Sequence, residues 1–294
     1  MLNLNKVARF LFTAGSPRKI VPPSINDFKK NPKWDKTDTT YYGTSTNNNG
    51  TLIHHYTEAY INTKKKEKFS NNIKIGDKIT KIRNILKNDL DSKDQKIRMM
   101  ALIVTLVDQA YFRIGNSKSE KEDIRGLHNL QAKHITINGG IHFNYKGKDK
   151  IIQHQIVVDK KIESIIEKIL ENKKPDNYMF TFKDNEGKEK IVTPEMVNEY
   201  LKNNLDSPIT IHKFRTYHAT KLATEELDKI KVDDKKSSSE VLKEFNDVMD
   251  TISKKLGHTT SNTTIKHYID YKVLESFFKK HKTRMPKSVS RGKI

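Results

Sequence analysis

The sequence predicts an α+β protein, with a small N-terminal β-rich domain over residues 1–77 and a larger, mainly α-helical domain over residues 78–294. Prolines and turn residues interrupt the first 75 positions, whereas apolar residues recur at helical spacing after about residue 78. A short stretch of alternating apolar residues between positions 135 and 158 predicts a small hairpin sheet inside the helical domain.

The first 75 residues favour turns and strands over helices. Asn47–Gly50 is a strong turn signal, and residues 52–61 partly alternate as a strand would. The basic run at residues 64–68 is expected to be a hairpin tip or a basic loop. The prolines that interrupt any helix in this region are Pro17, Pro22, Pro23 and Pro32.

The first long helix of the larger domain is predicted to begin at a capping box, Ser92-x-x-Gln95. Its apolar face runs toward Tyr111, and Gly115 is expected to end it. Arg113 would then be mounted at the C-terminal end of a buried helix.

Three segments in which apolar and polar residues alternate predict the small sheet. Residues 135–137 and 141–145 flank the hairpin turn Asn138–Gly139, and a third strand runs over residues 152–158. The chain turns at Gly147, so Lys148 is expected at the tip of the second hairpin. A long side chain at that tip can reach outward into a site.

The remaining chain is predicted to be helical. Thr193 caps a helix with proline at its first position, and another helix begins near Thr210 and carries Arg215 in its first turns. A third helix begins near Ser238 and is closed by Gly257, which places His258 just past a helix end.

The composition favours a protein that binds a polyanion. The 294 residues include 56 Lys and Arg against 36 Asp and Glu, a formal net charge of +20. The basic residues are spread along the chain, which suits a protein wrapped around a duplex. Alternatively, the positive charge reflects a lysine-rich composition that has no role in binding.

Several absences narrow the chemistry. Without cysteine, the chain has no disulfide scaffold, no thiol nucleophile and no cysteine-based zinc site. No apolar run approaches the roughly 18 residues that a membrane span needs. No phosphate-binding Gly-Lys-Ser/Thr loop and no metal-binding cluster is present, so neither a nucleotide cofactor nor a metal is expected.

Five residues together could cleave a phosphodiester without a metal. This chemistry needs a nucleophile, cations that neutralise the phosphorane, and a proton donor for the leaving 5′ oxygen. Arginine is scarce, with nine among the 56 basic residues, and its planar fork can hold two phosphate oxygens. Singly, each residue has an ordinary structural role, and Tyr271 is a second candidate nucleophile. The five candidates are Arg113, Lys148, Arg215, His258 and Tyr268.

The contexts of these residues resemble the type IB DNA topoisomerases, especially the compact enzymes of poxviruses and other large DNA viruses and their bacterial relatives. Phe112–Asn116 with residues 126–135 is similar to the first arginine motif of that family. Residues 143–150 are similar to its lysine hairpin, and residues 213–217 to its second arginine motif. Residues 256–270 are similar to its terminal histidine and tyrosine box.

The resemblance implies the catalytic fold shared by tyrosine recombinases and type IB topoisomerases. It implies a monomer that clamps double-stranded DNA between the β-rich domain and the catalytic domain. Tyr268 would form a 3′-phosphotyrosyl link, with Arg113, Arg215 and His258 stabilising the transition state and Lys148 as general acid. The nicked strand would swivel and be religated without ATP or metal. Further DNA contacts are expected from Lys64, Lys65, Lys66, Lys68, Lys133 and His212.

Two other functions stay open on the sequence. His212-x-x-Arg215 is typical of tyrosine recombinases, which share the mechanism but assemble on paired sites. A non-catalytic DNA-binding protein would explain the charge and would bind in a salt-sensitive way. A location inside the cell and on DNA follows from the substrate alone: host cytoplasm or virion for a viral enzyme, otherwise nucleoid or nucleus.

Overall fold

The computed structural model describes residues 27–34, 40–46, 50, 52–116, 123–205 and 209–290. Pro17, Pro22, Pro23 and the turn residues Asn47–Asn49 lie outside these ranges. The chain divides into two compact units, Met1–Ser70 with Lys293–Ile294, and Asn71–Gly292. The division falls within helix α2 (Glu58–Asp89), the same helix that contains the expected domain boundary at residue 77.

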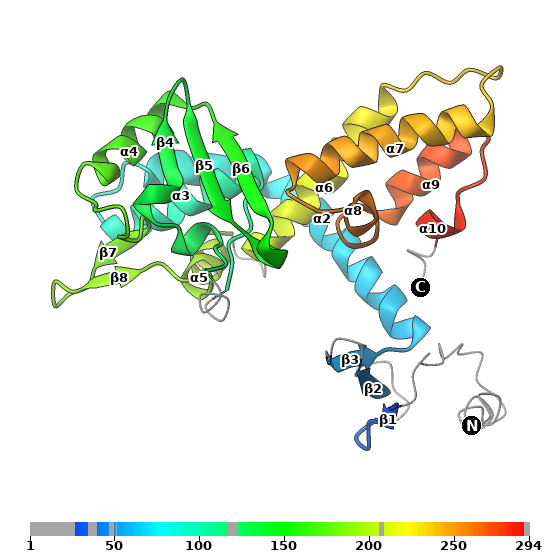
Figure 1. The fold of residues 1–294 in the computed structure, drawn as a ribbon, viewed down its shortest axis with the longest axis horizontal. Coiled ribbons are helices and arrows are strands. Elements are labelled where there is room, and N and C mark those ends of the chain that lie inside the picture. Colours follow the sequence, from blue (N-terminus) through cyan, green and yellow to red (C-terminus); the bar gives the residue numbers. More distant parts are fainter. Residues whose placement is uncertain are drawn as a thin grey trace. The chain divides into compact units, whose positions relative to one another are not determined.

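The first unit contains a three-stranded antiparallel sheet in the order β1-β2-β3. Its strands are β1 (Lys29–Lys30), β2 (Gly43–Thr46) and β3 (Leu52–His55), and β2 pairs with both neighbours (Figure 1). The β-rich character expected near the N-terminus is therefore present in the described strands.

The expected strand over residues 52–61 is confirmed only as far as His55, because residues 58–61 belong to α2. The hairpin tip or basic loop expected at residues 64–68 is wrong, because this run also lies in α2. The Thr57 hydroxyl accepts a hydrogen bond from Tyr60 N at 3.1 Å, as a capping residue does at a helix start. Lysine and glutamate are good helix formers, and Lys64 pairs with Glu67 one turn later. These local preferences outweigh the weak alternation that suggested a strand.

The second unit holds the predicted helices and the small sheet. Helix α3 (Gln95–Ala110) packs against α5 (Pro194–Leu205), α6 (Ile211–Asp228) and the strands β6 (Ile152–Val157) and β7 (Thr181–Lys183). Nine residues of α3 are buried, which makes it the centre of the first apolar cluster. Strand β7 pairs with β8 (Glu189–Ile191), a two-stranded ribbon that the sequence patterns did not predict.

The predicted ends of α3 need correction. Asp94, not Ser92, is the N-cap, and its carboxylate accepts from Lys96 N at 2.7 Å and Ile97 N at 3.3 Å. The helix ends at Ala110, because Tyr111 adopts a left-handed conformation with φ 58°. Arg113 therefore lies on the extended segment after the helix, two residues beyond this cap, and Gly115 is not the terminator.

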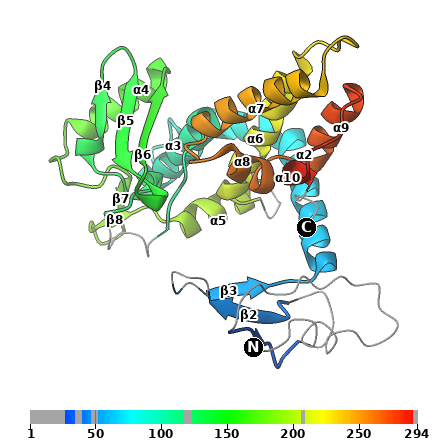
Figure 2. The ribbon, with the colours of Figure 1, turned by 45° about the vertical axis from the view of Figure 1, so that its right-hand side comes forward.

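The predicted hairpin sheet is confirmed. Strands β4 (Ile135–Ile137), β5 (Ile141–Lys146) and β6 form one antiparallel sheet in that order. Helix α4 (Lys160–Leu170) lies beside this sheet, and its residues Ile162 and Ile166 belong to the same buried cluster as Phe143 (Figure 2). The short helical turn η4 (Lys148–Lys150) closes the second hairpin, where Lys148 was expected.

The C-terminal helices surround a second apolar cluster. Besides α6 these are α7 (Ser238–Lys255), α8 (Ser261–His267), α9 (Tyr271–Lys280) and α10 (Lys287–Ser290). Helix α6 contributes to both clusters, with Phe214 in the first and Ala219 in the second. Arg215 therefore lies at the junction of the two. The predicted starts of α5, α6 and α7 and the left-handed Gly257 with φ 61° are confirmed.

These elements confirm the α+β class, with small antiparallel sheets in a mostly helical chain. Within the described ranges, no helix combines the length and apolar character needed to cross a membrane.

Candidate active site

Arg215 is the most buried charged side chain of the candidate site, with 2% of its surface exposed. Its guanidinium donates to the carbonyl oxygens of Tyr111 and, at 2.7 Å, Leu256. A buried charge is tolerated only when hydrogen bonds replace its lost water. Arg215 thereby ties α6 to the segment after α3 and to the end of α7.

Burial lowers the pKa of Arg215 to about 10, and the positive charge of Arg113 lowers it in the same direction. A pKa of about 10 still leaves this guanidinium charged at neutral pH. Its Nε has no hydrogen-bond partner among the described residues.

Tyr268 lies at the C-terminal end of α8 and is held by its backbone. Its N–H donates to Thr264 O at 2.9 Å, and its carbonyl accepts from the Thr220 hydroxyl at 3.1 Å. The side chain is 5% exposed, and its hydroxyl accepts a hydrogen bond from Arg113 Nη1 at 2.9 Å. The hydroxyl that binds Arg113 therefore belongs to Tyr268. Tyr271, the other candidate nucleophile, is the first residue of α9.

Two guanidinium groups and two imidazole rings surround the Tyr268 ring. The guanidinium carbon of Arg113 lies 5.7 Å from the ring centre and that of Arg215 lies 5.6 Å away. The ring centres of His258 and His212 are 4.4 Å and 5.8 Å distant. The geometry brings together four of the five predicted residues, and His212 joins them.

The contacts of His258 define its tautomer. Arg215 Nη2 donates to His258 Nε2 at 3.2 Å, and a guanidinium can only donate, so Nε2 carries no proton in this arrangement. The proton of the neutral ring is then on Nδ1, which lies 2.7 Å from the Thr264 hydroxyl. Thr264 in turn bonds to Ser253 of α7. These two hydroxyls fix the ring plane that faces Tyr268.

The pKa of His258 is lowered to about 3. Burial is the largest cause, followed by the positive charges of Arg215 and Arg113, with a smaller effect from Lys148. His258 is therefore neutral at physiological pH and offers hydrogen bonds, not a permanent charge.

Lys148 projects from η4, between Gly147 and the left-handed residues Asp149 and Lys150. It is exposed and lines a cavity of about 670 Å³ together with Arg113, Arg215 and His212. The cavity wall carries one carboxylate against five Lys and Arg side chains, an arrangement that suits an anionic ligand. Its other lining residues are Phe112, Ile114, Gly115, Asn116, Ile124, Arg125, Asp149, Lys150 and Ile211.

The predicted DNA-contacting lysines are not part of this cavity. Lys133 forms an exposed ion pair with Asp176 at 2.8 Å. Lys64 forms another with Glu67, also at 2.8 Å, and Lys66 is exposed on the same helix, to which Lys65 and Lys68 also belong. Their contacts with DNA stay predictions.

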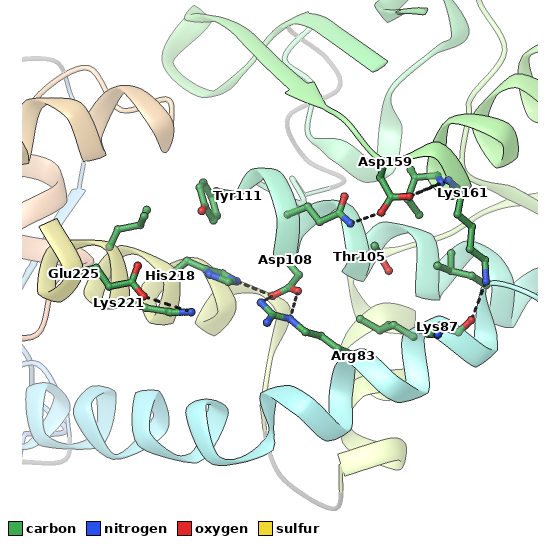
Figure 3. A pocket seen from close by; sticks show the side chains of 15 residues that line it. Arg83, Lys87, Thr105, Asp108, Tyr111, Asp159, Lys161, His218, Lys221 and Glu225 are labelled. Carbon is green, nitrogen blue, oxygen red and sulfur yellow. Dashed lines mark hydrogen bonds and ion pairs between the residues drawn. The ribbon is translucent and has the colours of Figure 1, made fainter. Parts of the chain in front are cut away.

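The sequence did not reveal a buried polar network behind the two arginines. Asp108 on α3 accepts a hydrogen bond from His218 Nε2 on α6 at 2.8 Å, and Arg83 Nε donates to its other oxygen at 2.8 Å (Figure 3). Burial raises the pKa of Asp108, but the hydrogen bonds from His218 and Arg83 outweigh it and hold the pKa below its ordinary value.

This network forms a double link between α3 and α6. Asp108 binds His218. Three residues after Asp108, the Tyr111 carbonyl binds Arg215, which lies three residues before His218. The Tyr111 ring also packs on His218, with ring centres 5.1 Å apart. The residues of each pair, 108 with 111 and 215 with 218, are three positions apart in the sequence. No sequence pattern indicated that these two segments contact each other.

Within the described ranges, no group of three or more His, Asp or Glu side chains is arranged to hold a metal ion.

Comparisons with known proteins concern most of the chain. The family model of the eukaryotic DNA topoisomerase I catalytic core matches residues 57–289. DNA topoisomerase 1 of Xenopus laevis is 28% identical over 174 residues, covering 56% of this chain and 20% of that protein. The human enzyme is 27% identical over 174 residues, covering 56% and 21%. The chain thus matches about a fifth of the length of these relatives.

These relatives are animal enzymes and do not test the expected placement near viral and bacterial enzymes. Among solved structures, the pre-cleavage complex of XerH site-specific recombinase bound to difH substrate is 19% identical. It covers 67% of this chain and 51% of that chain, with a TM-score of 0.41.

We predict that Asp108→Ala lowers the free energy of unfolding by about 2–4 kcal/mol, because it leaves His218 buried without its partner. Urea unfolding followed by circular dichroism measures the change. The matched control is Asp176→Ala, which breaks an exposed pair of the same length and should cost less than about 1 kcal/mol. Equal effects of the two substitutions would contradict the role assigned to the network.

We also predict that the His258 ring does not titrate between pH 8 and pH 5, because its pKa is lowered to about 3. The unfolded chain takes up this proton near pH 6.5, so the stability contributed by His258 is full above that pH and declines as the pH falls toward 3. NMR of the imidazole signals, with His258→Gln to assign the resonance, measures the titration. A midpoint near 6.5 would refute the proposed environment.

Proposed function

Because the chain belongs to the family of eukaryotic DNA topoisomerase I catalytic cores, we propose that it relaxes supercoiled DNA by transient cleavage of one strand at Tyr268. The observation that supports this most directly is the Tyr268 hydroxyl, which accepts a hydrogen bond from Arg113 beside the buried guanidinium of Arg215. A phenol among fixed cations has the surroundings that a phosphoryl-transfer nucleophile needs.

Cleavage begins when the Tyr268 oxygen attacks a backbone phosphorus in line with the leaving 5′ oxygen, and the phenol proton passes to solvent water. The new bond joins the tyrosine oxygen to phosphorus, and the bond that breaks is the one to the 5′ oxygen. The strand then ends in a 3′-phosphotyrosyl link and a free 5′ hydroxyl. The link keeps the energy of the phosphodiester, so religation needs no nucleotide. The fixed arginines and Lys148 take the role that a metal ion would otherwise have in stabilising the developing charge.

The cationic cavity is the proposed place of the phosphate. Arg113 and Lys148 line it, and Arg215 forms its buried wall. Fixed guanidinium donors stabilise the charge that develops on the two non-bridging oxygens, and they need little reorganisation during the reaction. The neutral His258 accepts from Arg215 at Nε2 in this arrangement, and it becomes a donor to a non-bridging oxygen when the ring proton moves to Nε2 and the Thr264 hydroxyl donates to Nδ1. Ser253 and Thr264 hold the ring plane.

Lys148 is the proposed general acid. Its position at a hairpin tip lets a long side chain follow the leaving oxygen, and it lies close enough to His258 to influence its pKa. The ammonium proton goes to the 5′ oxygen as that oxygen leaves, and the neutral amine accepts a proton when the 5′ hydroxyl attacks back.

The proposed substrate is double-stranded DNA, bound by a monomer. The net charge of +20 supports binding to a polyanion with a strong dependence on salt. Between cleavage and religation the free strand end rotates about the intact strand, which removes supercoils. His212 is a proposed phosphate contact, since it lines the cavity and its ring faces Tyr268.

We predict that the wild-type chain converts supercoiled plasmid into a ladder of relaxed topoisomers in EDTA without ATP. Tyr268→Phe should reduce relaxation below detection while keeping DNA retardation on a gel, because it removes only the attacking oxygen. Tyr271→Phe is the matched control and should relax DNA as the wild type does. Relaxation by Tyr268→Phe would rule out this nucleophile, and DNA cleavage without relaxation would favour a recombinase.

A further inference from the structure

Gln153 is a buried polar residue on the inner side of the small sheet. It lies on β6 opposite Tyr145 of β5, and 7% of its side chain is exposed. The inner positions of β5 and β6 are otherwise mainly apolar, so a buried amide here requires polar partners. Those partners belong to the segments that carry two of the proposed catalytic residues.

The first partner is the turn before His258. Gln153 Nε2 donates to the Gly257 carbonyl at 3.4 Å. Gly257 adopts the left-handed conformation, and a Cβ at this position would collide with Gln153 Oε1. The left-handed backbone and this close contact both favour glycine at position 257, and the backbone that enters His258 rests directly on the Gln153 side chain.

The second partner is the residue before Lys148. A Cβ on Gly147 would lie 2.7 Å from Gln153 Cγ, which is closer than side chains approach. Gly147 N also donates to Ile151 O at 2.7 Å and closes the hairpin whose tip is Lys148. One side chain thus touches both glycines that immediately precede the proposed general acid and the proposed histidine.

The orientation of the Gln153 amide is set by a neighbour. Gln155 Nε2 donates to Gln153 Oε1 at 3.3 Å, so the oxygen faces Gln155 and the amide nitrogen faces the Gly257 carbonyl. Both glutamines are buried on the same side of β6. A rigid strand therefore carries a fixed bridge between the lysine hairpin and the histidine turn.

We propose that Gln153 is a positioning residue that holds Lys148 in place for proton transfer, by locking its hairpin against the Gly257 turn. The proposal rests on the proposed function, in which Lys148 protonates the leaving 5′ oxygen. Gln153 itself touches no reacting atom. Its loss frees the hairpin tip, and the long lysine side chain then spends less time near the leaving group.

The test compares two DNA substrates that differ in one atom. In the first, the scissile bond joins phosphorus to the ordinary 5′ oxygen, which needs a proton to leave. In the second, sulfur replaces that oxygen, and it leaves as a thiolate because thiols are far more acidic, with a pKa near 8.5. Loss of proton donation therefore slows cleavage of the first substrate but not of the second.

We expect Gln153→Ala to slow single-turnover cleavage of the oxygen substrate by about 100-fold, within the range that general acids contribute. Cleavage of the sulfur substrate should stay within a few fold of wild type. Lys148→Ala should show the same pattern more strongly. His154→Ala is the matched control, since it lies next along β6 on the exposed side and should change neither rate.

Gln153→Met is a second variant for the case in which Gln153→Ala does not fold. It keeps the side-chain volume between the two glycines but cannot donate to the Gly257 carbonyl. Circular dichroism and DNA retardation check both variants. If only the methionine variant folds, it carries the test, and the same selective loss on the oxygen substrate is expected.

Two results would overturn the proposal: equal slowing of both substrates, which marks a merely structural residue, or wild-type rates on both. Failure of the proposed function gives a different pattern. In that case the wild-type chain cleaves neither substrate, or Lys148→Ala is not rescued by sulfur.

Discussion

The buried guanidinium of Arg215 is the constraint around which the site is organised. Burying a charge costs several kcal/mol unless its hydrogen bonds are replaced, so the carbonyls of Tyr111 and Leu256 must stay where this side chain needs them. One carbonyl belongs to the segment that leads to Arg113, and the other lies two residues before His258. A single side chain at the junction of the two apolar clusters thereby fixes the relative positions of the two segments that carry Arg113 and His258, which are proposed catalytic residues.

Several local features serve this arrangement. The left-handed turn at Tyr111 ends α3 early and directs its carbonyl at Arg215, and the pair of Asp108 with His218 locks the same two segments one turn deeper (Figure 3). On the other side, the left-handed Gly257 lets the chain approach Gln153 and present His258. The tyrosine then lies among cations whose positions are set before any substrate arrives, which is the condition for electrostatic catalysis.

Much of this could be predicted from the sequence, because it depends on local patterns. The alternation of apolar residues predicted β4, β5 and β6. The positions of glycines predicted Lys148 at a hairpin tip and His258 just after α7. The helix at residues 64–68 was missed because lysines give no periodic signal, and the end of α3 because a left-handed tyrosine has no sequence signature. Asp108, His218 and Gln153 were not found because their roles depend on contacts between segments far apart in sequence, over 100 positions in two cases.

Bond formation between Tyr268 and DNA is measured most directly by trapping the covalent complex and locating the modified residue. A duplex with a short strand beyond the cleavage point loses that strand after cutting, so the complex accumulates and can be digested for mass spectrometry. The geometry predicts a nucleotide joined through its 3′ phosphate to the peptide that contains Tyr268. A nucleotide on Tyr271, a link through a 5′ phosphate, or no covalent complex from a chain that relaxes DNA would contradict the mechanism.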